Sequence, residues 1–192
     1  MFDEVIKYLI DHLEISIEQV TDIRSPDDRY FRNRARGIRA PYFRLSLTTP
    51  PLEYAEHMEV SAQIESFEGA FEVFTFANPL PALASFANQN VNASFAKGVK
   101  SVVIAGSHAF RVGDFIKFSN HAKVYRISSV TPGTNTTIGL SCPLIESISA
   151  VTDLIYGANV NFQVCLSNNY SQEVSGKNGN FGMVDVELIE QA

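Results

Sequence analysis

Arginine is concentrated in one short segment of this 192-residue sequence. Seven Arg and two Asp between Arg24 and Arg44 give that segment a net charge of +5, and since the whole chain carries −6, the rest carries −11. Six of the seven lie within residues 22–40, the arginine-rich arm: Arg24, Arg29, Arg32, Arg34, Arg36 and Arg39. A planar guanidinium group binds a carboxylate through two parallel hydrogen bonds and loses its hydration more readily than an ammonium group. The arm is therefore suited to contact an acidic protein surface.

Matching carboxylates follow the arm in the sequence. Residues 52–72 contain six Glu and no Lys or Arg, and Glu53, Glu56 and Glu59 are spaced so that a helix would carry them close together. We expect the arm of one copy of the chain to bind these carboxylates on an adjacent copy. Two alternatives are a solvated loop with ion pairs inside one molecule and a nucleic-acid site, whose usual electrostatic footprint is a basic run. The acidic remainder of the chain favours the subunit interface.

The same helical spacing raises the question of a metal site. Glu53 and His57 are four residues apart, and Glu56 and Glu59 are three apart, so each pair would share a helix face. A metal site needs further ligands, and the sequence offers a single His here and no second cluster. We therefore expect an exposed polar helix face, with no metal and no cofactor.

The other histidines and the two cysteines fit no catalytic pattern. His12, His108 and His121 stand in no Ser/His/Asp or Cys/His signature, so we expect no enzymatic activity. Two Cys are too few for a disulfide framework and fit a reducing compartment. We expect Cys142 and Cys165 to be buried free thiols, because Cys packs as a small hydrophobic residue.

Residues 91–166 combine basic and aromatic side chains. The basic residues are Lys97, Lys100, Arg111, Lys117, Lys123 and Arg126. The aromatic residues include Phe110, Phe115, Phe118, Tyr125 and Tyr156. OB-fold barrels use this combination to stack bases or sugars, but a small barrel also needs aromatic residues in its core and Lys on its outside. The absence of Trp and the usual burial of aromatic residues favour the core.

Composition and alternation indicate a folded protein of the α+β class that is mostly β. Hydrophobic residues make up 45% of the chain and include 14 Phe and 7 Tyr, which excludes a chain too polar to fold. The apolar stretches are far shorter than the roughly 20 residues that span a bilayer, so we expect no membrane segment. The first residues carry acids where a secretory signal needs positive charge, so we do not expect export by that route.

Periodicity places the elements of the first 80 residues. We expect a helix over 2–13, strands over 14–20, 42–47 and 71–76, and a second helix between the last two strands. A threonine at 48 or 49, followed by two prolines, predicts the start of the second helix, and Gly69 predicts its end. The stripe that we expect this helix to bury consists of Leu52, Ala55, Met58 and Ala62, extended by Phe67 just beyond the helix, with Glu on the opposite side.

Short alternating segments separated by turns dominate after residue 90. We expect strands over 92–95, 100–105, 114–118, 123–130, 135–140 and 158–166. A Gly- and Asn-rich stretch at 167–180 predicts a turn before a final strand over 183–189. The final strand can return to the first part of the chain, so we expect two domains. One comprises 1–90 and 167–192, with the N-terminal helix and the arm, and the other is an inserted barrel of residues 91–166.

The order of several motifs resembles a family of phage proteins. YFRLSL (42–47), two prolines, an acidic helix and GAFEVFTFANPLP (69–81) resemble the N-terminal domain of phage tail proteins. The segments that resemble the barrel inserted in that domain are KSVVIAG (100–106), RVGDFIKF (111–118), KVYRI (123–127) and NTTIGLSCPLIESI (135–148). MVDVELIE (183–190) resembles its final strand. Over about 150 residues, the set is similar to distal tail proteins of long, non-contractile-tailed phages that carry an OB-fold insertion.

The resemblance implies a tail-tube-like β-sandwich with a flanking helix and an inserted OB-like barrel, in a non-enzymatic virion protein. Such proteins form a ring, here expected to be a hexamer, at the tail tip after assembly in the host cytoplasm. The implied partners are the tail tube protein, the hub or baseplate and fibre proteins, and the tape-measure protein. DNA passes through the bore without specific binding, which the net negative charge favours. The alternative is an OB-type binding module for oligosaccharide or single-stranded nucleic acid.

Overall fold

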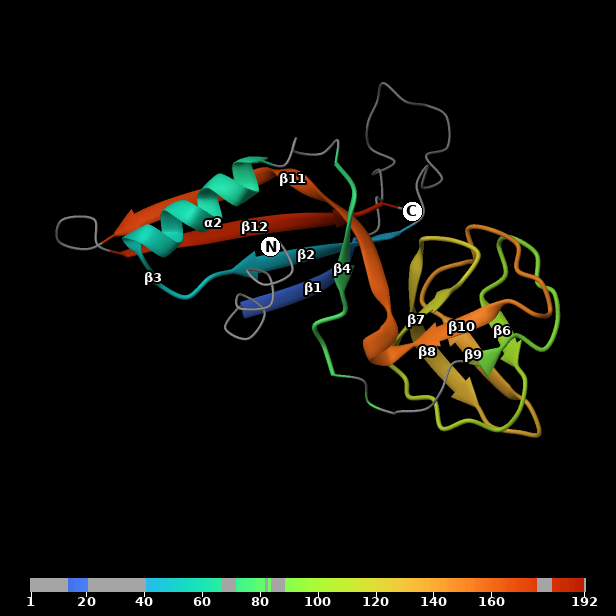
Figure 1. Cartoon of the computed structure of the whole chain (residues 1–192). Coiled ribbons are helices and arrows are strands. Elements are labelled where there is room, and N and C mark those ends of the chain that lie inside the picture. The colour runs from blue at the N-terminus through green and yellow to red at the C-terminus, as the bar shows by residue number, and fades with distance from the viewer. Residues whose placement is uncertain are drawn as a thin grey trace, which may run out of the picture. The chain divides into compact units, whose positions relative to one another are not determined.

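The computed structural model describes residues 14–20, 41–66, 72–81, 83, 89–175 and 181–191. Within these ranges the protein is mostly β, with two sheets, one of them nearly barrel-shaped, and one α-helix (Figure 1). The expected α+β, mostly β class is therefore confirmed. The expected helix over 2–13, the arginine-rich arm and the expected helix end at Gly69 lie outside the described residues.

The chain divides into two compact units. The sheet unit draws on three stretches, whose described parts lie within 14–19, 43–74 and 164–191. The barrel unit draws on residues within 75–163, and it also includes Val20 and residues 41–42. The barrel unit thus interrupts the sheet unit between Phe74 and Val164. We expected the interrupting part to be residues 91–166, and the ring-forming role of the remainder stays a prediction.

The first sheet has the strand order β1-β2-β12-β11-β4, with β3 paired to β12. Its strands are β1 (Glu14–Val20), β2 (Tyr42–Thr48), β3 (Leu52–Glu53), β4 (Phe74–Ala77), β11 (Asn161–Ser175) and β12 (Phe181–Glu190). Alternation explains β2, whose apolar residues Phe43, Leu45 and Leu47 are buried, and Leu45 lies opposite Leu188 of β12. The strands expected over 14–20 and 42–47 are therefore confirmed as β1 and β2.

The segment between β2 and the helix differs from the expected threonine-capped start. Thr49 is buried, its N–H donates to the Val184 carbonyl at 3.1 Å, and its hydroxyl accepts from the Val184 N–H at 3.0 Å. The Thr49 side chain therefore prolongs the pairing of β2 with β12 and does not cap the helix. The helix α2 (Tyr54–Ser66) begins only after the short strand β3.

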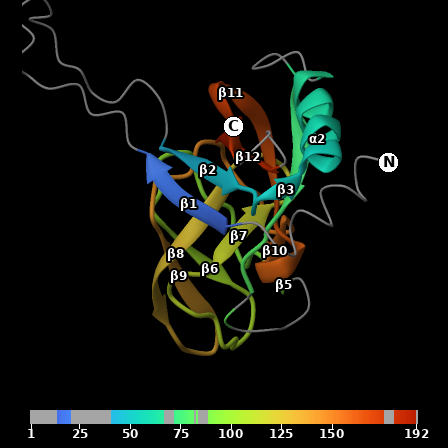
Figure 2. The ribbon, with the colours of Figure 1, turned by 90° about the vertical axis from the view of Figure 1, so that its left-hand side faces the viewer.

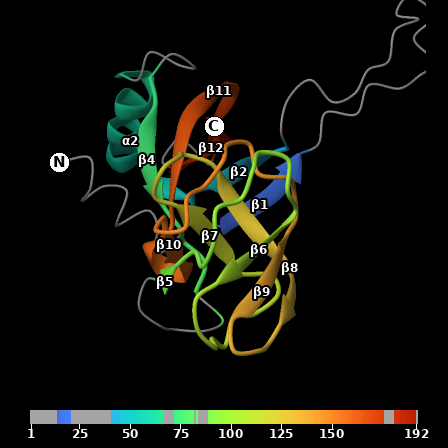
Figure 3. The same cartoon turned by 90° about the vertical axis from the view of Figure 1, so that its right-hand side faces the viewer.

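The second sheet, in the barrel unit, has the order β5-β10-β7-β8-β9-β6 with antiparallel neighbours throughout. Its strands are β5 (Gln89–Asn90), β6 (Ser101–Ile104), β7 (Phe115–Phe118), β8 (Val124–Thr131), β9 (Thr136–Leu140) and β10 (Asp153–Tyr156). An antiparallel bridge between Val91 and Ile104 joins the two edge strands, so the sheet curls nearly into a barrel (Figure 3). A 3-10 turn, η2 (Gly157–Asn159), leads into β11.

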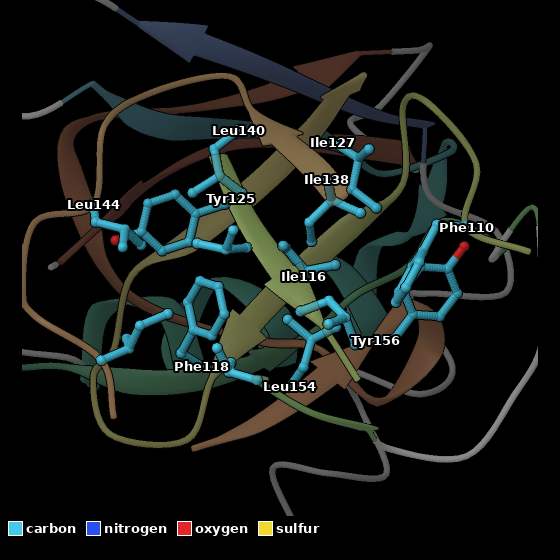
Figure 4. Close-up of a cluster of buried hydrophobic side chains, with 14 of the residues drawn as sticks. Phe110, Ile116, Phe118, Tyr125, Ile127, Ile138, Leu140, Leu144, Leu154 and Tyr156 are labelled. Carbon is cyan, nitrogen blue, oxygen red and sulfur yellow. The ribbon is translucent and has the colours of Figure 1, made fainter. Parts of the chain in front are cut away.

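Aliphatic and aromatic side chains from every part of the barrel meet in its interior (Figure 4). The buried cluster includes Phe110, Ile116, Phe118, Tyr125, Ile127, Ile138, Leu140, Leu144, Leu154 and Tyr156. Each of these is at most 4% exposed. The expectation that Phe110, Phe118, Tyr125 and Tyr156 form a core is confirmed, and Phe115 is buried as well.

Three strand predictions need correction. The expected strand over 92–95 is only a pair of isolated bridges at Val91 and Phe95, and β10 was missed because four residues carry too little alternation. Part of the expected turn over 167–180 is strand, since β11 continues to Ser175 opposite β12. The register of that pairing shifts between Leu166 and Tyr170, where Ser-Asn-Asn interrupts the apolar pattern.

Candidate interface on the acidic helix

The carboxylates predicted to bind the arm gather at the start of α2. Glu53, Glu56 and Glu59 are all exposed, and the Glu53 N–H donates to Glu56 Oε2 at 3.3 Å. This contact is the backbone half of a capping box, in which a side chain at the third helical position reaches back to the residue before the helix. None of these three carboxylates forms an ion pair among the described residues, whereas Glu187 pairs with Arg44 at 3.2 Å. The six arginines predicted to bind them lie outside the described residues.

The face of α2 that is buried differs from the face expected. Residues His57, Val60 and Ser61 are buried, and Ile64 packs against a small cluster of Leu52, Val60 and Val184. These positions recur at intervals of three and four residues, so they form one continuous helix stripe. Only Leu52 of the expected buried stripe lies inside, and Phe67 lies outside the described residues.

The outward face of α2 carries the apolar residues that were expected inside. Ala55, Met58 and Ala62 are exposed, and Tyr54 lies one turn before Met58 on the same face. Tyr54 is 53% exposed and Met58 is 48% exposed. We define Tyr54, Ala55, Met58 and Ala62 as the outer stripe. The sequence analysis identified three members of this stripe but assigned them to the wrong side, and it missed Tyr54.

His57 lies against the backbone of β12. A Cβ atom added to Gly182 would overlap the imidazole ring and lie 2.8 Å from its Nε2 atom. His57 is 1% exposed, and neither of its ring nitrogens nor the Ser61 hydroxyl has a hydrogen-bond partner among the described residues. The expectation that His57 belongs to an exposed polar face is therefore wrong, because its ring packs into the space above Gly182.

The described residues contain no group of three or more His, Cys, Asp and Glu that could hold a metal ion. Glu53 is exposed while His57 is buried, so this pair does not present its ligand atoms to a common site. Cys142 and Cys165 are both buried, as expected.

The barrel unit contains a buried carboxylate. Asp114 is 4% exposed, and its Oδ2 atom accepts a short hydrogen bond from the Tyr156 hydroxyl. Its Oδ1 atom accepts from the Leu83 N–H at 2.9 Å. Both oxygens are thus engaged inside the unit, which fits a structural role because neither is directed to solvent.

His121 takes part in a second buried polar contact. The Tyr125 hydroxyl accepts the Ile145 N–H at 3.1 Å and is hydrogen-bonded to His121 Nε2 at 3.0 Å. The other ring nitrogen, Nδ1, has no partner among the described residues, so a protonated ring would carry a buried charged N–H without an acceptor. The neutral form of the ring is the one that fits.

The pKa of His121 agrees with that form. Burial lowers the pKa of His121 below its ordinary value of 6.5, since a charged ring would lose its hydration. Glu146 opposes this effect, while the positive charges of Lys117 and Lys123 add to it. Lys123 itself is fully buried, which corrects the expectation that the lysines of this segment lie on the outside of the barrel.

Comparison with models of known protein families and with curated proteins gives no match to this sequence. Across the ranges that the structure describes, no helix combines the length and the apolar character needed to traverse a membrane.

Proposed function

We propose that this chain is a structural protein of a phage tail tip. In this proposal the chain forms a ring, which we expect to be a hexamer, and the ring joins the tail tube to the hub or baseplate and fibre proteins. The ring surrounds the path of the DNA and contacts the tape-measure protein during assembly. Surfaces, rather than a catalytic pocket, carry the function.

One observation carries the proposal: the motifs that resemble distal tail proteins fall in order on the elements of an interrupted sheet. YFRLSL forms β2, the acidic segment forms α2, and MVDVELIE lies in β12, which pairs with β2 in antiparallel register from Asp185 to Ile189. The residues between Thr75 and Gln163 form the separate barrel unit. A sheet domain with an inserted barrel is what the resemblance implies.

The alternative, a module that stacks sugars or bases, has less support. Phe110, Phe115, Phe118, Tyr125 and Tyr156 are all buried, so none of these five rings offers a face to a ligand. Stacking on exposed aromatic rings is what gives OB-type modules their affinity for single strands. The net charge of −6 also disfavours contact with phosphates.

Electron microscopy tests the proposed function. The full chain, purified and concentrated, is expected to form particles that class averages of negatively stained images show as six-fold rings with an open centre. A protein that stays monomeric at every concentration and binds oligonucleotides with a steep salt dependence would overturn the proposal in favour of the alternative.

A further inference from the structure

We infer that the outer stripe of α2 is a docking surface for the arginine-rich arm of a second copy of this chain. The inference rests on the proposed function, because it names the partner of one surface in the assembled ring. It starts from the orientation of the helix, which the sequence alone did not predict.

The helix packs Val60 and Ile64 against the sheet, but it also buries polar side chains and leaves apolar ones half exposed. His57 and Ser61 are buried without hydrogen-bond partners among the described residues, whereas Tyr54 and Met58 are about half exposed. In a helix whose only task is to cover a sheet, the apolar stripe faces the core. A local departure from this rule is expected where a surface serves binding. The orientation of α2 therefore marks the outer stripe as a contact surface.

Charge identifies the occupant of this surface. Glu53, Glu56 and Glu59 border the outer stripe, and residues 52–72 contain no Lys or Arg. The arm offers six Arg against three Asp, and between its arginines it carries Tyr30, Phe31 and Ile38. An apolar stripe with an acidic rim along one side is thus complementary to a basic segment that carries apolar residues. The N-terminal residues 1–13 contain three acids and one Lys, so their charge opposes docking at this rim.

Geometry favours the arm of a second copy over the arm of the same molecule. The arm joins the sheet at Tyr42, next to Phe43, whose N–H donates to Glu190 at 3.0 Å. The helix starts at the opposite end of β12, where Glu53 pairs with Phe181 (Figure 1). At about 3.3 Å per strand residue, these two ends of β12 are roughly 30 Å apart.

Within one molecule, the arginines near the ends of the arm fall short of the start of α2, whereas Arg29 and Arg32 in its middle have enough chain to reach it. Arg36 is six residues from Tyr42, which gives it a reach of about 20 Å along the extended backbone, and Arg39 reaches less. Arg24 is four residues from Val20, and Figure 2 shows the end of β1 beside the start of β2. A neighbouring copy is free of this limit and can align the whole arm with the outer stripe.

Photo-crosslinking on the full chain tests the partner directly. A p-benzoylphenylalanine residue replaces Met58, and ¹⁵N-labelled and unlabelled copies are mixed at high salt and assembled by dilution. We expect crosslinked peptides that join position 58 of one isotope to residues 22–40 of the other. The same probe at Val151, which is 76% exposed in the barrel unit, is the control and is expected to give no crosslink to the arm.

Three crosslinking results would overturn the inference. They are crosslinks to residues 22–40 of the same isotope only, crosslinks to residues 1–13, and assembled rings that give no crosslink to the arm. The last result would contradict the docking of the arm but not the proposed ring, so the experiment distinguishes a failure of this inference from a failure of the proposed function.

Peptide binding tests the surface even if the chain does not assemble. A fluorescent peptide of residues 22–40 is expected to bind the full chain in a saturable and salt-sensitive manner. The double variant Glu53→Lys/Glu59→Lys is expected to weaken binding about tenfold, and a peptide with Arg24, Arg29 and Arg32 changed to Glu is expected to restore it. Glu72→Lys, another exposed acid outside the helix, is the matched control. Equal binding to all variants, or no binding to the parent, would overturn the inference.

Discussion

The imidazole ring of His57 occupies the space that a side chain on Gly182 would fill. The two residues lie on α2 and β12, and their contact fixes which face of the helix is turned toward the sheet. Gly182 on the central strand and His57 on the helix therefore pack directly against each other, although 125 residues separate them in the sequence.

Gly182→Ala is expected to destabilise the sheet unit by about 1–3 kcal/mol, because the new methyl group overlaps the ring and forces the helix away. Urea denaturation followed by circular dichroism measures the loss. His57→Ala in the same background is expected to recover part of it, since the space is then free. Equal stabilities of Gly182→Ala and the parent would contradict the contact.

Ser61→Ala is expected to raise the free energy of unfolding by about 0.5–1 kcal/mol. The Ser61 hydroxyl is buried without a partner among the described residues, and Ala has the higher helix propensity. The measurement is the midpoint of urea denaturation. A lower midpoint would show that the hydroxyl makes a stabilising hydrogen bond.

Tyr156→Phe is expected to destabilise the barrel unit by about 1–3 kcal/mol, because one oxygen of the buried Asp114 carboxylate loses its donor. Thermal unfolding, monitored by near-ultraviolet circular dichroism, reports the change. Tyr54→Phe removes the same hydroxyl from an exposed ring and serves as the control. Equal effects of the two substitutions would argue against the buried contact.

The stability of the barrel unit is expected to fall in mild acid. Burial holds the pKa of His121 below its unfolded value of 6.5, so the unfolded chain binds a proton more readily than the folded one. The contribution is fully present above about pH 6.5 and is lost as pH falls toward the folded pKa. Denaturation between about pH 7.5 and pH 5 measures this slope, and NMR titration of the ring gives the pKa directly. His121→Gln is expected to flatten the profile, and an unchanged slope would assign it to another group.

The sequence predicted which segments form strands and helices better than it predicted which residues those segments pack against. Alternation located β1 and β2, since a strand with one buried face leaves a period of two in its own residues. The existence of α2 was also predicted, but its buried face was not, because the choice depends on a glycine far away in the sequence. Met58 is apolar and His57 is polar, so local pattern alone favours the wrong orientation.

The same dependence on distant partners explains the other differences. Thr49 resembles a helix cap in its local sequence, yet Val184 of β12 binds both its backbone and its hydroxyl. Ser-Asn-Asn at 167–169 is typical of a turn, yet β12 holds the chain as strand on both sides of it. The three glutamates of the candidate interface were predicted from helical spacing and all lie on the surface, although Glu53 belongs to β3 and not to the helix. Tyr54 was missed because the predicted helix had no defined first turn.

The position of β12 in the sequence has a consequence for the order of folding. It pairs with β2, β3 and β11, so the sheet has no central strand until β12 has been synthesised. Likewise, the N–H of Phe43 donates to the carboxylate of Glu190, which lies 147 residues later in the chain. The barrel strands β7, β8 and β9 are sequential neighbours, and all strands of their sheet precede β11. Contacts between residues close in sequence form faster than distant ones. During translation the barrel unit therefore folds first, and the sheet unit with its α2 surface is completed only after it.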